Sequence, residues 1–136
     1  MRERDMLVDL DDLEKTATRL NASTDRVMKV LRDVERYLNG LNIGIEVSRG
    51  VPGATTVMGF GKTSDKKWGF FIVENDEHLG IECMKRLDRC SLLPLIPALI
   101  KDLTIVGYSI ALRQEKELEA HELNKFFPEK TLRGVK

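Results

Sequence analysis

Four short runs of bulky apolar residues, each interrupted by at least one glycine, follow one another in the middle of the chain. They occupy residues 43–47, 57–61, 68–73 and 79–83. The turn-forming segments between them are about four to six residues long, which suits antiparallel hairpins and is too short for parallel crossovers. The sequence therefore predicts four β-strands joined as an antiparallel meander.

Period-two alternation sorts the side chains of these strands onto two faces. One face gathers the bulky residues and is the expected core, whereas the other gathers glycines from all four strands: Gly44, Gly59, Gly69 and Gly80. Glycine inside a strand marks a bend, a bulge or a close approach of a backbone or ligand. Sheet curvature or close helix packing is one explanation, and a shallow furrow that binds a ligand or a partner segment is the other.

Two helices are predicted before the strands. Leucines and alanines recur at three- and four-residue intervals from Leu7 to Leu20, and a second stripe runs from Val27 to Leu38. The polar segment 21–24 separates the stripes, and Ser23 or Thr24 is placed to cap the second helix. Gly40 is expected to end it.

One long helix is predicted after the strands, over residues 93–127. Pro94 and Pro97 mark its start and Pro128 its end. A main apolar stripe from Leu95 to Ile110 can lie on the sheet. The predicted fold is therefore α+β: two N-terminal helices, a four-stranded antiparallel meander and one long C-terminal helix packed on the sheet.

A second apolar stripe runs along the opposite side of this C-terminal helix. With the aromatic end of the helix, it gives a candidate interaction surface: Ile105, Tyr108, Leu112, Leu123, Phe126 and Phe127. The N-terminal helices could cover it, or a second copy of the chain could cover it in a twofold dimer. A helix of about 35 residues spans roughly 50 Å, which is longer than a four-stranded sheet can shield. We expect some self-association and an unidentified protein partner.

Length and composition restrict the remaining possibilities. A chain of 136 residues suits one domain, expected over 1–128 with a flexible tail at 129–136. Twenty-two basic and 22 acidic side chains cancel, so the average charge favours neither nucleic acid nor an anionic membrane. The charged N-terminus lacks an apolar signal region, and Lys101 and Asp102 interrupt the apolar segment 92–112. We expect a cytoplasmic protein that does not span a membrane.

Few residues have the arrangement that catalysis requires. Residues 59–63 (GFGKT) resemble the end of a phosphate-binding loop, but Thr56 stands where that loop needs glycine and a strand follows instead of a helix. His78, beside acidic residues in a turn, is a candidate acid–base or metal group without assignable partners. Cys83 and Cys90 are expected to be buried or partly buried thiols, and Cys83 is expected to be inert. We expect no cofactor and no metal.

Basic side chains gather at one end of the predicted meander, because alternate hairpin loops lie at the same end. This basic pole comprises Lys62, Lys66, Lys67, Lys85, Arg86 and Arg89. It could hold a phosphate, an acidic protein segment or a nucleic-acid backbone, or it could be an ordinary solvated surface.

Three functions follow from the sequence. The first is a non-enzymatic protein–protein interaction module of adaptor, chaperone-like or regulatory type, homodimeric through the C-terminal helix. The second is a small-molecule or anion-binding domain that uses the glycine face or the basic pole. The third is an enzyme that uses His78 and the neighbouring acids.

Overall fold

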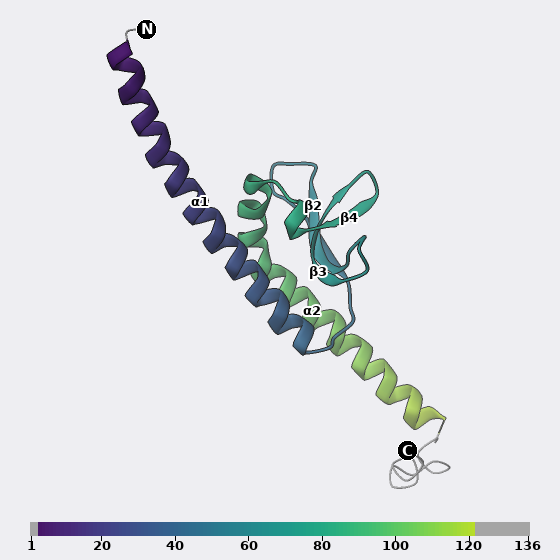
Figure 1. Cartoon of the computed structure of the whole chain (residues 1–136). Coiled ribbons are helices and arrows are strands. Elements are labelled where there is room, and N and C mark those ends of the chain that lie inside the picture. Colours follow the sequence, from purple (N-terminus) through teal and green to yellow (C-terminus); the bar gives the residue numbers. More distant parts are fainter. Residues whose placement is uncertain (1–2, 122–136) are drawn as a thin grey trace.

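The computed structural model describes residues 3–121 and shows an α+β fold in which two long helices pack against a four-stranded sheet (Figure 1). Helix α1 (Glu3–Gly40) precedes strands β1 (Val47–Gly50), β2 (Val57–Lys62), β3 (Trp68–Glu74) and β4 (Glu77–Gly80). A 3-10 helix, η1 (Ile81–Cys83), leads into helix α2 (Arg86–Ala120). The predicted antiparallel sheet and long C-terminal helix are confirmed.

The sheet is the predicted meander. Its strands lie in the order β1-β2-β3-β4, and every neighbouring pair is antiparallel. Phe60 lies opposite Phe70, and Met58 lies opposite Ile72. These four side chains are buried in the core, so the period-two alternation identified the core face correctly.

The core lies between this face of the sheet and one side of both helices. Helix α1 contributes Leu31 and helix α2 contributes Leu92 and Leu99, and all three are completely buried. They belong to one cluster with Phe70, which has no exposed surface either. Because α1 meets mainly β3 and α2 meets mainly β1, each helix covers a different half of the sheet.

The prediction of two N-terminal helices was wrong, because α1 continues without a break from Glu3 to Gly40. The Ser23 and Thr24 hydroxyls donate hydrogen bonds to the Leu20 carbonyl oxygen, at 2.9 and 2.8 Å. Side chains that bond back to the preceding turn are compatible with a helix interior, so neither residue has to act as a cap.

The first strand begins later than predicted, and the last strand ends earlier than predicted. Asn42 and Gly44 have positive φ angles (53° and 65°), which break the extended run at 43–47 and delay β1 until Val47. Strand β4 ends at Gly80, and Ile81–Cys83 forms η1 instead.

The predicted burial of Cys83 and Cys90 was wrong as well, since both are free and exposed.

Helix α2 begins at Arg86, seven residues before the predicted start, and contains Pro94 and Pro97 in its interior. Both prolines lie on its exposed side. Carbonyl groups that lose their helical partner at a proline can there bind water, which lowers the cost of an internal proline.

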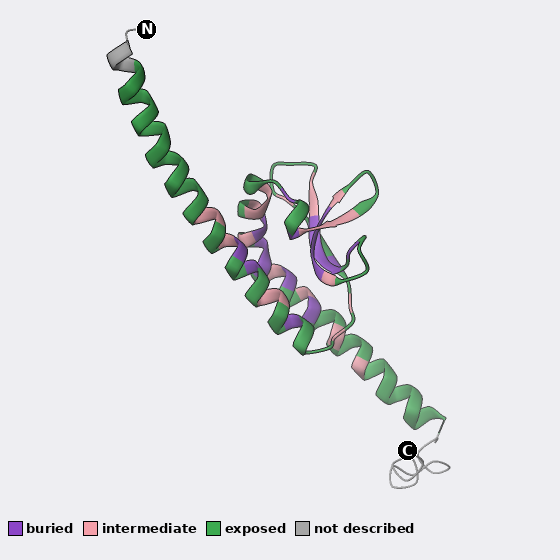
Figure 2. Ribbon diagram, viewed as in Figure 1, coloured by how far each residue is buried: buried purple, intermediate pink, exposed green. Residues whose placement is uncertain are grey.

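The two helices overlap over only part of their lengths. Arg86, the first residue of α2, donates a hydrogen bond to the Asn21 side chain of α1 at 3.3 Å. The first half of α1 therefore precedes the start of α2, and Figure 1 shows the last part of α2 projecting from the other end of the molecule. Both projections are exposed (Figure 2).

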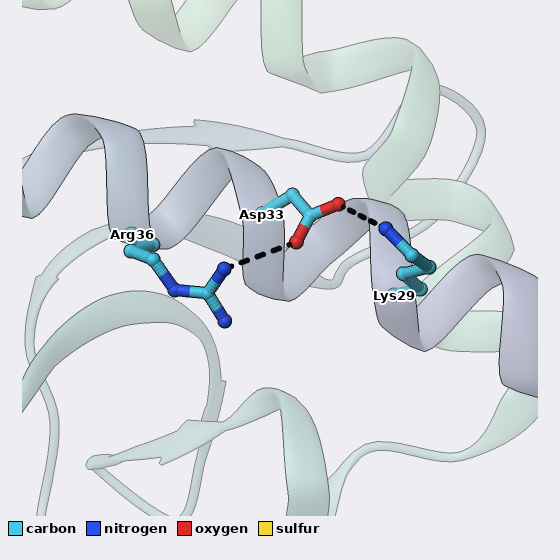
Figure 3. Close-up of polar contacts among 3 residues, drawn as sticks. All are labelled: Lys29, Asp33 and Arg36. Carbon is cyan, nitrogen blue, oxygen red and sulfur yellow. Dashed lines mark hydrogen bonds and ion pairs between the residues drawn. The ribbon is translucent and has the colours of Figure 1, made fainter.

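Ion pairs mark the solvent side of α1 beside the sheet. Asp33 accepts a hydrogen bond from Lys29 at 2.8 Å and pairs with Arg36 at 3.4 Å (Figure 3). The bond from Lys29 holds the pKa of Asp33 below its ordinary value.

A bidentate ion pair joins helix α2 to the sheet. Arg49 of β1 binds both carboxylate oxygens of Asp102 in α2, at 2.6 and 2.9 Å.

The packing of β2 gives a direct test of this sheet. A Cβ atom added at Gly59 would overlap the Val47 carbonyl oxygen and lie 2.7 Å from Phe71 Cζ, whereas one added at Gly50 would meet nothing within 4 Å. We expect Gly59→Ala to lower the free energy of unfolding by about 3 kcal/mol. Gly50→Ala should change it by less than about 1 kcal/mol. Urea denaturation of both variants checks this, and equal stabilities would contradict the register.

Candidate functional site

The predicted interaction surface on α2 lies open where the structure describes it. Ile105 is 57% exposed, Tyr108 67% and Leu112 38%. Helix α1 does not cover them, because it packs beside the earlier part of α2. Leu123, Phe126 and Phe127 lie outside the described residues. We call Ile105, Tyr108 and Leu112 the α2 face.

A second open apolar surface, which was not predicted, lies on the first half of α1. We call residues 3–20 the α1 arm. Its exposed large apolar side chains are Met6, Leu7, Val8, Leu10, Leu13 and Leu20. The signal was present in the sequence as a regular apolar stripe. This stripe was assigned to the first of two short helices, which could have covered the C-terminal helix.

The basic pole is not a uniformly positive surface. Arg89 donates to the Ile81 carbonyl oxygen at 2.9 Å, which ties α2 to η1, and Arg86 binds Asn21. The remaining members are exposed lysines: Lys62, Lys66, Lys67 and Lys85. A pocket of about 220 Å³ beside Lys67 also contains the carboxylates of Glu35, Asp65 and Glu82. These acids offset the lysine charge that an anion would need.

The four glycines do not line one furrow. Gly44 lies in the loop before β1, outside the sheet. The space above Gly59 holds the Phe71 ring, and the space above Gly69 holds the Glu35 carboxylate. Of the three of these glycines that lie in the sheet, Gly80 alone has room, since an added Cβ there would meet nothing closer than 4.0 Å. Close helix packing therefore accounts for Gly69, which lies against Glu35 of α1, whereas Gly59 is enclosed by residues of β1 and β3.

Glu35 is a partly buried carboxylate at the sheet edge that no sequence pattern identified. Strand β4 pairs with β3 only from Phe71 onward, which leaves the Phe70 N–H without a strand partner. Glu35 Oε2 accepts that N–H at 2.6 Å. Burial raises the pKa of the Glu35 carboxyl above 4.5, against the lowering effect of the Phe70 hydrogen bond. This carboxylate takes the place of a β4 residue at the strand edge.

His78 is held by contacts on the outer face of the sheet. Its ring stacks on Phe71 with centroids 4.0 Å apart, and its Nδ1 lies 3.5 Å from Glu46 Oε1. The Glu46 side chain in turn occupies the space above Gly61. These contacts support a packing role for His78, in which it covers Phe71.

No group of three or more His, Cys, Asp or Glu side chains within residues 3–121 is placed to hold a metal ion. Over the same range, α2 alone is long and apolar enough, by length and composition, to cross a membrane. Part of that helix packs on the sheet through Leu95, Leu99 and Leu103.

Comparison with known proteins gives no family assignment. No protein-family model matches the chain, and no match was found among curated proteins or solved structures.

The raised pKa of Glu35 predicts how stability depends on pH. Ionising Glu35 in the folded protein costs free energy, and this cost is absent below pH 4.5 and complete above the folded-state pKa. Glutamine keeps an oxygen that can accept the Phe70 N–H and carries no charge. We therefore expect the stability of Glu35→Gln to rise relative to the wild type as pH increases through this window.

Urea denaturation between pH 4 and pH 7 measures this difference, and a difference independent of pH would contradict it. Glu35→Ala is the matched variant that removes the acceptor. It should lose about 1–3 kcal/mol, because the Phe70 N–H is then left without its partner.

Proposed function

We propose that this chain is a non-enzymatic, homodimeric protein–protein interaction module that engages partners through helix surfaces its own sheet leaves uncovered. The α2 face is the proposed docking surface for a partner protein. The observation that supports this most directly is the exposure of Ile105, Tyr108 and Leu112 on one projecting helix. Contiguous exposed apolar side chains rimmed by polar residues are typical of protein-binding surfaces.

The composition of the α2 face fits this role. Tyr108 is an exposed aromatic residue, and tyrosine is among the residues that contribute most to binding at protein interfaces. Charged and polar side chains follow Leu112 directly, from Arg113 to Glu117, and can form the polar rim. A rigid helix also loses little conformational entropy when a partner binds.

The other two functions have weaker support. A ligand on the glycine face would have to displace Phe71, which packs above Gly59, and Glu35, which accepts a hydrogen bond from the Phe70 N–H. Acid–base chemistry at His78 would have to release its stacking on Phe71. The α2 face needs no such rearrangement before a partner can bind.

Site-specific photo-crosslinking tests the proposal in the native cell. Tyr37 is a matched control for Tyr108, because it is also a helical tyrosine with nearly the same exposure (68% against 67%). With a photoreactive phenylalanine analogue at Tyr108, we expect a covalent adduct of defined mass, at least several-fold more abundant than at Tyr37.

Ile105→Lys should abolish that adduct, because a charge replaces a central apolar contact. The protein should remain folded, since Ile105 is mostly exposed. An adduct with a different protein would support docking at the α2 face, whereas an adduct with a second copy alone would contradict it. Equal labelling at Tyr37 and Tyr108 would contradict it.

A further inference from the structure

Helix α1 carries one apolar stripe along its whole length. Its members alternate at spacings of four and three residues: Met6, Leu10, Leu13, Ala17, Leu20, Thr24, Val27, Leu31, Val34 and Leu38. This is the heptad pattern of coiled coils, in which these residues occupy the a and d positions of the helix seam. The stripe therefore provides ten successive a and d positions at which α1 can contact other elements.

The second half of the stripe is covered within the chain, and the first half is not. From Thr24 to Leu38, every member is buried or half-buried, whereas from Met6 to Leu20 every member is exposed. The change occurs at Asn21, where Arg86 begins the neighbouring helix. The α1 arm thus continues the apolar stripe that is packed inside the domain from Thr24 onward. Helix α2 begins beside Asn21 and does not extend along the arm.

The opposite side of α1 is polar along both halves. Asp11 and Lys15 form an ion pair at 3.2 Å in the arm, and Lys29, Asp33 and Arg36 do so beside the sheet (Figure 3). All five occupy b, c or f positions of the heptad, which face away from a seam. The arm is therefore amphipathic in the same sense as the packed half.

We propose that the α1 arms of two copies of this chain pair with each other as an antiparallel two-stranded coiled coil. The pairing rests on the homodimer proposed above and identifies the segment that forms it. Leu10 of each copy packs against Leu13 of the other, and Met6 packs against Ala17. The arrangement is twofold and closed, so assembly stops at two chains.

The described part of the arm and the start of α2 together favour this register. Residues 3–20 form about 27 Å of helix, and their midpoint lies between residues 11 and 12. Pairing about that midpoint brings a and d positions together and places Glu3 of one copy beside Leu20 of the other. The arm of the second copy then ends where α2 begins. A register shifted by one heptad toward the sheet would drive that arm into the start of α2.

Charge favours the antiparallel direction. In a parallel pair, e positions face g positions of the other helix, which places Asp9 opposite Glu14 twice. In the antiparallel register, e faces e and g faces g. Glu14 then lies beside Leu7 and Asp9 beside Thr16, so no like charges meet at these flanking positions.

Disulfide trapping distinguishes the two directions. The native cysteines Cys83 and Cys90 are free and exposed, so both are first replaced by serine. In that background, the pair Asp9→Cys and Thr16→Cys should form a covalent dimer on mild oxidation. Within one helix these positions lie about 10 Å apart, which is too far for an intramolecular bond.

The control variant carries Asp9→Cys and Glu14→Cys, the pair that a parallel coil would join. We expect at least about tenfold slower crosslinking for this variant than for Asp9→Cys with Thr16→Cys. Faster or equal crosslinking of the control overturns the antiparallel pairing.

The mass in solution tests the segment independently of cysteine chemistry. The wild type should sediment at about 31 kDa, twice the chain mass of 15.5 kDa. Leu10→Lys with Leu13→Lys should weaken the dimer at least about 100-fold and leave thermal unfolding of the monomer unchanged, because both leucines are exposed.

The matched variant, Ile105→Lys on the α2 face, should leave the dimer intact. If Ile105→Lys separates the chains and the leucine variant does not, the arm pairing is overturned while docking at the α2 face stands. If the dimer depends on Leu10 and Leu13 but Tyr108 labels no better than Tyr37, the arm pairing stands and docking at α2 fails. A monomeric wild type overturns the pairing.

Discussion

The contact between both helices and a small sheet determines the rest of this structure. Four strands span about 20 Å across the sheet, and the longest, β3, has seven residues. Helices α1 and α2 have 38 and 35 residues, or about 57 and 52 Å. The core around Leu31, Leu99 and Phe70 can hold only one stretch of each helix against such a sheet. The excess length of each helix must project. Since the start of α2 at Arg86 lies beside Asn21 of α1, α1 projects at one end and α2 at the other.

Local interactions alone support these projecting helices weakly. The Asp11–Lys15 pair in α1 and the Glu117–His121 pair in α2 are exposed i,i+4 contacts, each worth a few tenths of a kcal/mol. Isolated helices of about 15 residues are marginally stable in water. The core anchors one end of each helix, which removes the cost of nucleation, and partner contacts can then stabilise the other end. Exposed apolar side chains on these projecting helices are unfavourable in water, and for the same reason they favour contact with another protein.

The sequence was informative where a periodic pattern decided the structure and less so where single residues did. The alternation in the strands placed Phe60, Phe70 and Ile72 correctly in the core. Ser23 and Thr24 were wrongly predicted to cap a helix. A hydroxyl can either cap a helix or donate to a carbonyl of the preceding turn, and only the continuous apolar stripe favours the latter role. Gly44 lies outside the sheet because the loop takes a positive φ, which an apolar run does not reveal. The role of Glu35 could not be predicted from the sequence. It depends on β4 ending at Gly80, which leaves the Phe70 N–H of β3 free to bind Glu35.

Pairing through the α1 arms would also determine how the α2 faces are presented. In the antiparallel arrangement, the two domains lie at opposite ends of the paired arms, and each α2 projects further outward. From the midpoint of the arms to the end of α1 is about 28 residues, or about 43 Å, so the two α2 faces would lie at least about 85 Å apart. Two identical surfaces held apart by a stiff helical rod favour a partner that is itself dimeric or repetitive, because a second contact then forms at high effective concentration. A compact dimer formed directly through α2 would instead bury the surface that a partner needs. The exposed α1 arm therefore allows self-association and partner binding to occupy different helices.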